Sequence, residues 1–397
     1  MATSLPALSL AATTPENPEA LKNWKQWQTR GEKAFEYNQY GNAERSYKQA
    51  VAAAKGMGTT DLRFAKSYGD LGRLLTVRGR FSEAEPYLEQ ELKIKNATIG
   101  NQRGQLIPDM GTLIKFYINY GTKTKAEPLT DDLLAFVEGR MRDADDQSGA
   151  KNRYKKGQPL QAWAGQAAPV AIDPLMEWAI TCDDLGGLYM THGDLVFANR
   201  LFQAALDMKT TVLGKEHLSL ANSYDSLGRL CMLRNEFDEA ETFFRDALSI
   251  TQKIQPPGHP SIFSRTDRLA KCLIKEGKMD EAEKLYLGIN ASLAKDPSDC
   301  GNEARGMFAL GCLYADERKF TQAAPVLERA LASAQKFHGI DSVDNVPYLK
   351  KLSYVEYYLG QKGVEEQLKA RAERINPTVM PIKVTVKSLA LDPAPAD

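Results

Sequence analysis

The sequence predicts an all-α protein, a solenoid built from about eight helical hairpins. Three observations support this prediction: a phrase that recurs, a regular period, and apolar residues at helical spacing. The stretch SLGRLCMLRNEFDEAE at 226–241 matches DLGRLLTVRGRFSEAE at 70–85 in nine of sixteen positions, and a weaker copy, DLGGLYMTHGDLVFAN, occupies 184–199. The weaker copy keeps the Leu-Gly pair and the alanine but loses the charges. Because small and apolar residues recur while polar residues change, the phrase indicates scaffold rather than an active site.

The alanine of each EAE-like segment marks the period. These marker alanines are Ala43, Ala84, Ala126, Ala198, Ala240, Ala282 and Ala323. Successive markers are 41, 42, 72, 42, 42 and 41 residues apart, so a period near 42 is interrupted once by 30 extra residues. An eighth unit is expected in LSYVEYYLGQKGVEEQLKARAERI, with Glu365 in the marker position, as a terminal cap.

Each unit is expected to form two amphipathic helices. In the first quoted unit, small and apolar residues are spaced so that they share one face of each helix. They are Leu227, Gly228 and Cys231 in the first helix, and Ala240, Phe244, Ala247 and Leu248 in the second. Gly228 and the marker Ala240 are small because the two helices of the hairpin are expected to cross closely there. The same reasoning assigns Gly72, Gly186 and Gly311 to packing.

The carboxylates beside the markers have the spacing of a capping box, in which two side chains satisfy free backbone amides at a helix start. The pairs are Ser82 with Glu85, Thr124 with Glu127, Asp238 with Glu241, and Asp280 with Glu283. Carboxylates at this position also suit the positive end of the helix dipole. We therefore interpret them as caps, with catalytic carboxylates as the alternative.

The interruption of the period divides the chain. We expect a disordered tail at 1–17, three hairpins at 18–142, an insertion at 143–172, five hairpins at 173–375 with the last as a cap, and a second tail at 376–397. Asp173 and Pro174 suit the cap and first turn of the helix after the insertion. The second tail alternates Ile382, Val384 and Val386 with polar residues, which leaves an exposed strand as an alternative to disorder.

The insertion, DADDQSGAKNRYKKGQPLQAWAGQAAPVAI, loses helical periodicity and is rich in residues that favour loops. The simplest interpretation is a surface loop. Alternatively, it covers the groove of the solenoid or docks a partner. The residues available for that role are Tyr154, Trp163, Lys151, Arg153, Lys155 and Lys156.

Charge and hydropathy exclude several functional classes. Lysine plus arginine and aspartate plus glutamate both number 51, so the chain has no net charge and no basic block that would favour nucleic acid. No apolar stretch is long enough to cross a bilayer, so a membrane protein is not expected. The N-terminus lacks the positive region of a secretory signal, which favours a cytoplasmic location over export.

Cysteine spacing argues against a metal site and a disulfide framework. The chain has an odd number of cysteines without a CxxC pair, namely Cys182, Cys231, Cys272, Cys300 and Cys312. They are interpreted as buried free thiols in a reducing compartment. No phosphate loop, nucleophile elbow or HExxH motif occurs, so we expect no cofactor, no metal and no catalytic residue.

The Leu-Gly pair, the later alanine and the aromatic residue four positions on resemble the tetratricopeptide repeat (TPR). That repeat usually has a period of about 34 residues, and the longer units with turns such as GKEHLSLA and PPGHPSIF are similar to the kinesin-light-chain type. The resemblance implies a right-handed superhelix that binds a peptide or protein along a concave face lined by the first helix of each hairpin. His217 and His259 lie 42 residues apart at equivalent turns, with His338 near the next, and indicate turn chemistry rather than metal ligands.

Arg73, Lys115, Arg229 and Lys271 occupy one repeat position, two residues after the leucine, which the family pattern places on the concave face. Neighbouring cations of this kind suit a carboxylate or an acidic peptide segment. The predicted groove residues are Arg73, Lys115, Asn119, Asp183, Asn222, Arg229, Lys271 and Lys275. The alternative is pairing within a helix, because Asp70, Asp225 and Asp267 precede three of the cations by three or four residues, whereas nothing precedes Lys115 in this way.

The functional prediction is a non-catalytic scaffold that binds a peptide or protein partner. The alternative is a regulatory sensor, in which a short signalling peptide or small ligand enters the groove and changes the curvature of the solenoid to act on an effector.

Overall fold

The computed structural model describes residues 18–55, 61–99, 103–120, 122–147, 173–293 and 300–376. These residues form helices and turns, and no strand occurs among them. The α-helices in unit 1 (Met1–Arg234) are α1 (Pro18–Glu36), α2 (Tyr40–Lys55), α3 (Leu62–Val77), α4 (Phe81–Ile99), α5 (Ile107–Tyr120), α6 (Lys123–Gln147), α7 (Pro174–Thr191), α8 (Leu195–Leu213) and α9 (Leu218–Arg234). Those in unit 2 (Asn235–Asp397) are α10 (Phe237–Ile254), α11 (Pro260–Lys275), α12 (Met279–Leu293), α13 (Cys300–Asp316), α14 (Phe320–His338), α15 (Val346–Tyr358) and α16 (Lys362–Ile375).

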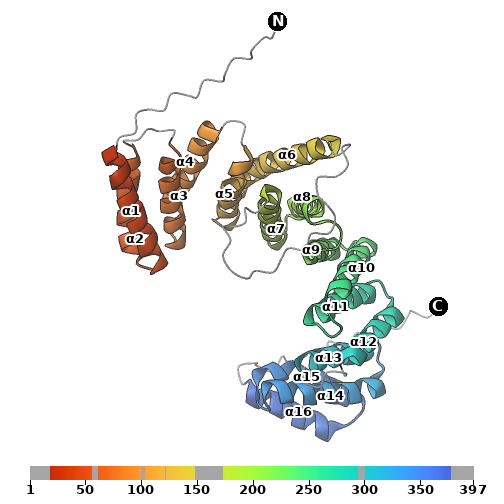
Figure 1. The fold of residues 1–397 in the computed structure, drawn as a ribbon. Helices are drawn as coiled ribbons and strands as arrows, with labels where there is room; N and C mark the ends of the chain where they lie inside the picture. Colours follow the sequence, from red (N-terminus) through yellow and green to blue (C-terminus); the bar gives the residue numbers. More distant parts are fainter. Residues whose placement is uncertain are drawn as a thin grey trace, which may run out of the picture. The chain divides into compact units, whose positions relative to one another are not determined.

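Consecutive helices pack as antiparallel hairpins within each unit (Figure 1). In unit 1 the hairpins are α1 with α2, α3 with α4, α5 with α6, and α7 with α8; in unit 2 they are α11 with α12, α13 with α14, and α15 with α16. Short 3-10 helices, η1 (Arg103–Leu106) and η2 (Val343–Asn345), precede α5 and α15. The predicted all-α architecture of repeated hairpins is therefore confirmed.

The marker alanines lie at the tightest points of this packing. All seven have no exposed surface, and Glu365, in the eighth marker position, is 8% exposed. The predicted packing glycines lie opposite: a β carbon at Gly186 would be 2.8 Å from the Phe202 ring, and one at Gly311 would be 2.6 Å from the Leu327 side chain. The residue that fills the space beside each glycine comes four positions after the marker, one helical turn further along.

The hairpin turns share one backbone feature. The residue five positions before a marker has a positive φ wherever the structure describes that position, with values between 57° and 81°. These residues are Asn38, Gly79, Gly193, Asn235, Gly277, Arg318 and Gly360. Glycine and asparagine adopt this left-handed conformation most readily, because their side chains clash least with the backbone. Arg318 is the exception, so its turn carries strain that the other turns avoid.

We expect Arg318→Gly to stabilise the protein. A side chain with a β carbon costs about 1 to 2 kcal/mol in the left-handed region, and the greater freedom of glycine in the unfolded chain offsets part of this, which leaves a gain of about 0.5 to 1 kcal/mol. The check is a thermal melt of this variant and of Gly360→Ala. The second variant introduces a β carbon at the same turn position of the next repeat and should lower the melting temperature. A lower melting temperature for Arg318→Gly would contradict the assignment of strain.

The capping-box interpretation is wrong. The helices α4, α6, α10 and α12 each begin one residue before the predicted cap, which places Ser82, Thr124, Asp238 and Asp280 inside the first turn. Periodicity located these helices but not their first residue, because the residue before each predicted cap, which is apolar in α4, α10 and α12, is also helical. The carboxylates of the EAE segments therefore have another role.

At three repeats, the glutamate directly after the marker forms an ion pair with a cation four residues before the next marker. We call such a pair an inter-repeat rung: Glu44 with Arg80 (2.8 Å), Glu241 with Lys278 (2.7 Å) and Glu283 with Lys319 (3.8 Å). Each rung joins the second helix of one hairpin to the turn of the next hairpin. Across the insertion the sign at the turn is inverted, because Asp194 stands four residues before Ala198 and pairs with Lys123 at 3.0 Å.

The predicted turn histidines are confirmed as helix-start groups. Nδ1 of His217 accepts from the Ser219 amide at 3.1 Å, and Nδ1 of His259 accepts from the Ser261 amide at 3.2 Å. His338 differs, since it ends α14 and lies 3.6 Å from Asp344.

Four of the five cysteines can be placed, and all four are free thiols: Cys182, Cys231 and Cys272 are buried and Cys312 is partly buried. Burial raises the pKa of Cys182 and of Cys272 to about 12, which disfavours the reactive thiolate. The Cys300 side chain, the tails at 1–17 and 377–397, and the insertion beyond residue 147 lie outside the described residues.

Candidate functional site

The predicted groove residues of unit 1 lie on α3, α5, α7 and α9, and we refer to the polar surface of α1, α3, α5, α7 and α9 as the first-helix face. Arg73 donates to Asp70 at 2.8 Å within α3 and to Glu91 of α4 at 3.1 Å. On the other side of Glu91, Lys95 is 3.1 Å from it and 2.7 Å from Asp109 of α5. The side chain of Arg73 is therefore a structural tie within the α3–α4 hairpin.

The same network continues to α1. Lys66 donates to Asp70 and to Glu32 of α1, both at 2.9 Å. Gln28, which is buried, donates to Asp70 as well. These bonds fix the charged side chains between the first two hairpins, so most of them are already satisfied before any partner binds.

The pKa values of two carboxyl groups in this network are shifted in opposite directions. Burial raises the pKa of the Glu91 carboxyl, although Arg73 and Lys95 oppose the shift. Burial would also raise the pKa of Asp70, but hydrogen bonds from Arg73 and Lys66 outweigh it and hold that pKa below its usual value. Space for Glu91 comes from Gly69, where a β carbon would lie 2.0 Å from the carboxylate. Removing Arg73 would leave a buried carboxylate with one cation fewer.

Lys115 bonds a carboxylate that local sequence does not supply. Its Nζ lies 2.7 Å from Asp184 of α7, across the insertion, and the two side chains are 40% and 55% exposed. This pair joins the first helices of the third and fourth hairpins at the surface. Because both groups are solvated, the pair is weak, and either group can exchange its partner at low cost.

Asp183 points the other way, into the hairpin. It accepts from Lys209 of α8, whose side chain is only 4% exposed and which also donates to Ser223 of α9 at 2.7 Å. Burial raises the pKa of Asp183, and Lys209 opposes that shift. Asp183 is thus partly buried, with 27% of its side chain exposed, and its bond to Lys209 ties it to the interior of the fourth hairpin.

The remaining predicted residues are on the surface. Asn119, Asn222 and Arg229 are exposed in unit 1, and Lys271 and Lys275 are exposed in unit 2. Lys271 pairs with Asp267 at 2.6 Å, as the within-helix alternative predicted. Arg73 with Asp70 is the second such pair.

Sequence reasoning missed the second-helix side chains that reach the first-helix face. Lys95 and Lys209 both stand 11 residues after a marker, and each binds a polar group four residues before the leucine of the next first helix, Asp109 or Ser223. That shared register is a signal in the sequence, and it identifies polar positions between hairpins.

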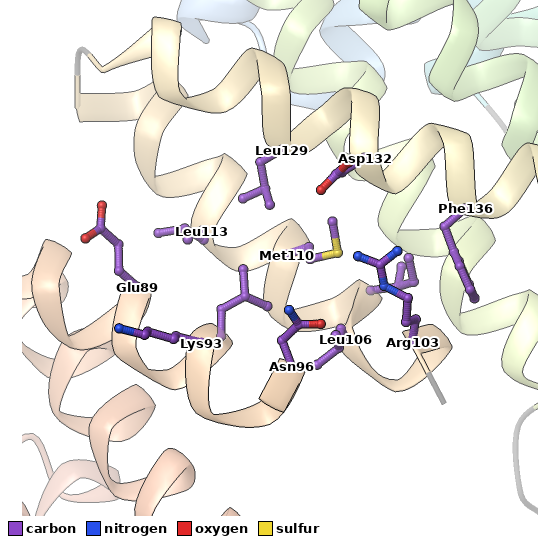
Figure 2. Close-up of a pocket in the computed structure, with 12 residues that line it drawn as sticks. Glu89, Lys93, Asn96, Arg103, Leu106, Met110, Leu113, Leu129, Asp132 and Phe136 are labelled. Atoms are coloured by element: carbon purple, nitrogen blue, oxygen red, sulfur yellow. The ribbon is translucent and has the colours of Figure 1, made fainter. Parts of the chain in front are cut away.

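A pocket lies where α4, η1, α5 and α6 meet, and none of the predicted groove residues lines it (Figure 2). Its volume is about 350 Å³. Apolar side chains form most of its wall: Leu92, Leu106, Ile107, Met110, Leu113, Leu129 and Phe136. Its polar lining residues are Glu89, Lys93, Asn96, Arg103 and Asp132.

Both ends of this pocket are fixed by contacts outside it. At one end, Tyr117 donates to Glu89 at 2.7 Å, and Lys125 of α6 donates to Glu89 at 3.1 Å, which ties α4 to α5 and α6. At the other end, the Phe136 ring packs edge-to-face on Trp178 of α7, with ring centroids 5.4 Å apart. The walls are therefore set by the packing of three hairpins, and the pocket is formed before any ligand enters.

A second pocket occupies the equivalent repeat position in unit 2. It lies between α10, α11 and α12, has a volume of about 300 Å³, and is lined by Leu248, Ile262, Leu285 and Ile289. Lys284 is its only charged lining residue among those the structure describes. The hollow itself thus follows from the repeat geometry, whereas the charges of the first pocket do not.

Models of the tetratricopeptide repeat match residues 64–102 and 179–253. The chain contains tetratricopeptide repeats. The first match covers most of the α3–α4 hairpin, and the second covers most of α7 to α10, so this TPR protein carries recognised repeats on both sides of the insertion.

The solved structures that are similar to this TPR protein include two with kinesin-light-chain-type names. BtubC (BKLC) from P. vanneervenii is 21% identical, with 67% of this chain and 99% of that chain covered and a TM-score of 0.46. A kinesin light chain with nearly identical TPR-like repeats from P. anserina is 19% identical, with 59% and 97% covered and a TM-score of 0.42. No curated protein matches the sequence. Among the described residues, none of the helices combines the length and hydropathy that crossing a bilayer requires.

Proposed function

We propose that this TPR protein is a non-catalytic scaffold that binds a protein or peptide partner across the first-helix face of unit 1, with an acidic segment of the partner near Lys115. The observation that carries the proposal is the pair of Lys115 with Asp184, which is exposed on both sides and joins two first helices. A partner carboxylate can replace Asp184 without exposing a buried charge. Asn119, one turn further along α5, offers an exposed amide beside it.

Arg73 is a poor centre for this site. Its guanidinium helps to neutralise Glu91, whose side chain is only 4% exposed, and exchanging that carboxylate for one from a partner would leave Glu91 with Lys95 as its one remaining cation among the described residues. The carboxylate that Lys115 binds, Asp184, is 55% exposed, so releasing it does not leave a buried charge. The proposed site is therefore centred on Lys115 and not on Arg73.

The test begins with a photo-crosslinking residue at position 119, in protein exposed to its native cell extract. The matched control carries the same residue at position 48, on the exposed side of α2. We expect a protein to be captured from position 119 and not from position 48. Equal capture at both positions would contradict a specific first-helix surface.

Binding of the captured partner then tests Lys115 directly. Lys115→Glu should weaken binding about tenfold, the loss expected when a charge-assisted contact becomes a repulsion, and the wild-type affinity should fall as salt rises. The double variant Lys115→Glu with Asp184→Lys restores an ion pair but moves the cation to α7. If the double variant binds as well as the wild type, Lys115 stabilises the fold and does not contact the partner.

A further inference from the structure

The charged rim of the pocket between α4, η1, α5 and α6 marks a second binding surface. Figure 2 shows Met110 and Leu129 pointing into the pocket, with Lys93 towards one end and Arg103 towards the other. Lys93 and Arg103 are exposed, and neither makes an ion pair within the part of the chain that the structure describes. Both cations are therefore available to a ligand that fills the apolar space between them.

The carboxylates of the rim do not cancel both cations. Glu89 is occupied by Tyr117 and Lys125, and the hydrogen bond from Tyr117 holds the pKa of Glu89 below its usual value. Asp132 is the one rim carboxylate without an ion pair among the described residues. The rim consequently presents two available cations and one available carboxylate, an excess of positive charge.

The size of the pocket defines the apolar part of the occupant. A dry cavity of about 150 Å³ holds one benzene ring, so a pocket of about 350 Å³ accommodates two side chains of the size of leucine or phenylalanine. Two apolar side chains that enter one groove side by side are presented by residues i and i+4 of a helix. The pocket is bounded by helices, which suits the insertion of another helix along the groove.

We propose that this pocket binds an amphipathic helix of a partner protein through two apolar side chains one turn apart, with carboxylates beside them that meet Lys93 and Arg103. This surface is separate from the first-helix face, so the inference goes beyond the proposed scaffold site. The equivalent pocket in unit 2 lacks the pair of cations and serves as an internal comparison, because it tests whether the hollow alone is enough.

The experiment is a selection from a displayed library of helical peptides on the full-length protein, followed by fluorescence polarisation with the enriched peptides. Two variants disturb the site differently: Leu129→Trp fills the pocket, and Lys93→Glu with Arg103→Glu reverses the rim. The control, Lys55→Glu with Lys215→Glu, changes two exposed cations of unit 1 that do not line the pocket. The NMR signal of the Met110 methyl group, assigned through Met110→Leu, reports contact inside the pocket.

We expect the enriched peptides to carry two large apolar residues one turn apart with aspartate or glutamate beside them, and to shift the Met110 signal. Each pocket variant should weaken their binding about tenfold or more, as for an anchor in a desolvated pocket, while the control binds as the wild type does. The inference is overturned if no peptide is enriched, if basic peptides are enriched, or if both pocket variants bind normally. Peptides lost only in Lys115→Glu would belong to the first-helix face, which would support the scaffold proposal and refute this one.

Discussion

Replacing Lys209 with methionine should destabilise unit 1 by about 2 to 4 kcal/mol, less than the ~3 to 5 kcal/mol typical of a fully buried ion pair, because the Asp183 side chain is 27% exposed. Methionine preserves the apolar stem of the side chain but leaves Asp183 without its cation, and Ser223 loses a donor. Urea unfolding followed by circular dichroism measures the loss as a lower midpoint. A second variant, Lys209→Met with Asp183→Asn, removes the unpaired charge and should recover more than half of the loss.

The pH dependence of Lys209→Met provides an independent check. Burial already raises the pKa of Asp183 in the folded protein, and the loss of Lys209 raises it further. A carboxyl whose folded pKa lies above its unfolded pKa takes up its proton more readily in the folded state, so stability rises as pH falls through the folded pKa. The deficit of the variant should therefore be smaller at pH 5 than at pH 7, and an equal deficit at both would mean that Asp183 does not carry the charge.

Placing leucine at a marker position should also destabilise the fold strongly. Ala282 has no exposed surface where α11 and α12 pack, so Ala282→Leu forces three additional carbon atoms into a filled space. Overpacking of this kind costs about 1 to 3 kcal/mol. Thermal melts should show a clear fall in melting temperature.

The control for this prediction lies on the same helix. Ala291 of α12 is exposed, so Ala291→Leu adds the same atoms without a clash and should leave the melting temperature nearly unchanged. If Ala282→Leu melts like Ala291→Leu, the hairpin crossing is looser than the marker pattern indicates.

The repeat period predicted the fold well because it records packing, which acts on every repeat alike. The marker alanines, the glycines opposite them and the all-helical class follow from small and apolar residues whose position is the same in each unit. The helix starts were harder to predict. A residue such as Phe237 is apolar whether it ends a turn or begins a helix, so periodicity cannot distinguish the two.

The candidate site was less predictable because its contacts cross between helices that are distant in sequence. The bond between Arg73 and Asp70 is visible in the sequence, since three residues span nearly one helical turn. Lys115 and Asp184 are 69 residues apart, and only the packing of α5 on α7 brings them together. The pocket depends on the distance between neighbouring hairpins, and no local pattern in a single sequence indicates that distance.

The inter-repeat rungs restrict the order in which units can be joined. At the three junctions that carry a rung, a deletion or duplication by recombination keeps this ion pair only if the new junction again places opposite charges on the rung. A unit that begins with Asp194 would place two carboxylates together after a second helix with glutamate after its marker, unless a cation such as Lys123 pairs with Asp194. The units marked by Ala198 and Ala240 carry Asp194 and Glu236 at this position and thus cannot form a rung with such a glutamate. Substitution within a unit would therefore disturb the rungs less than shuffling of the units.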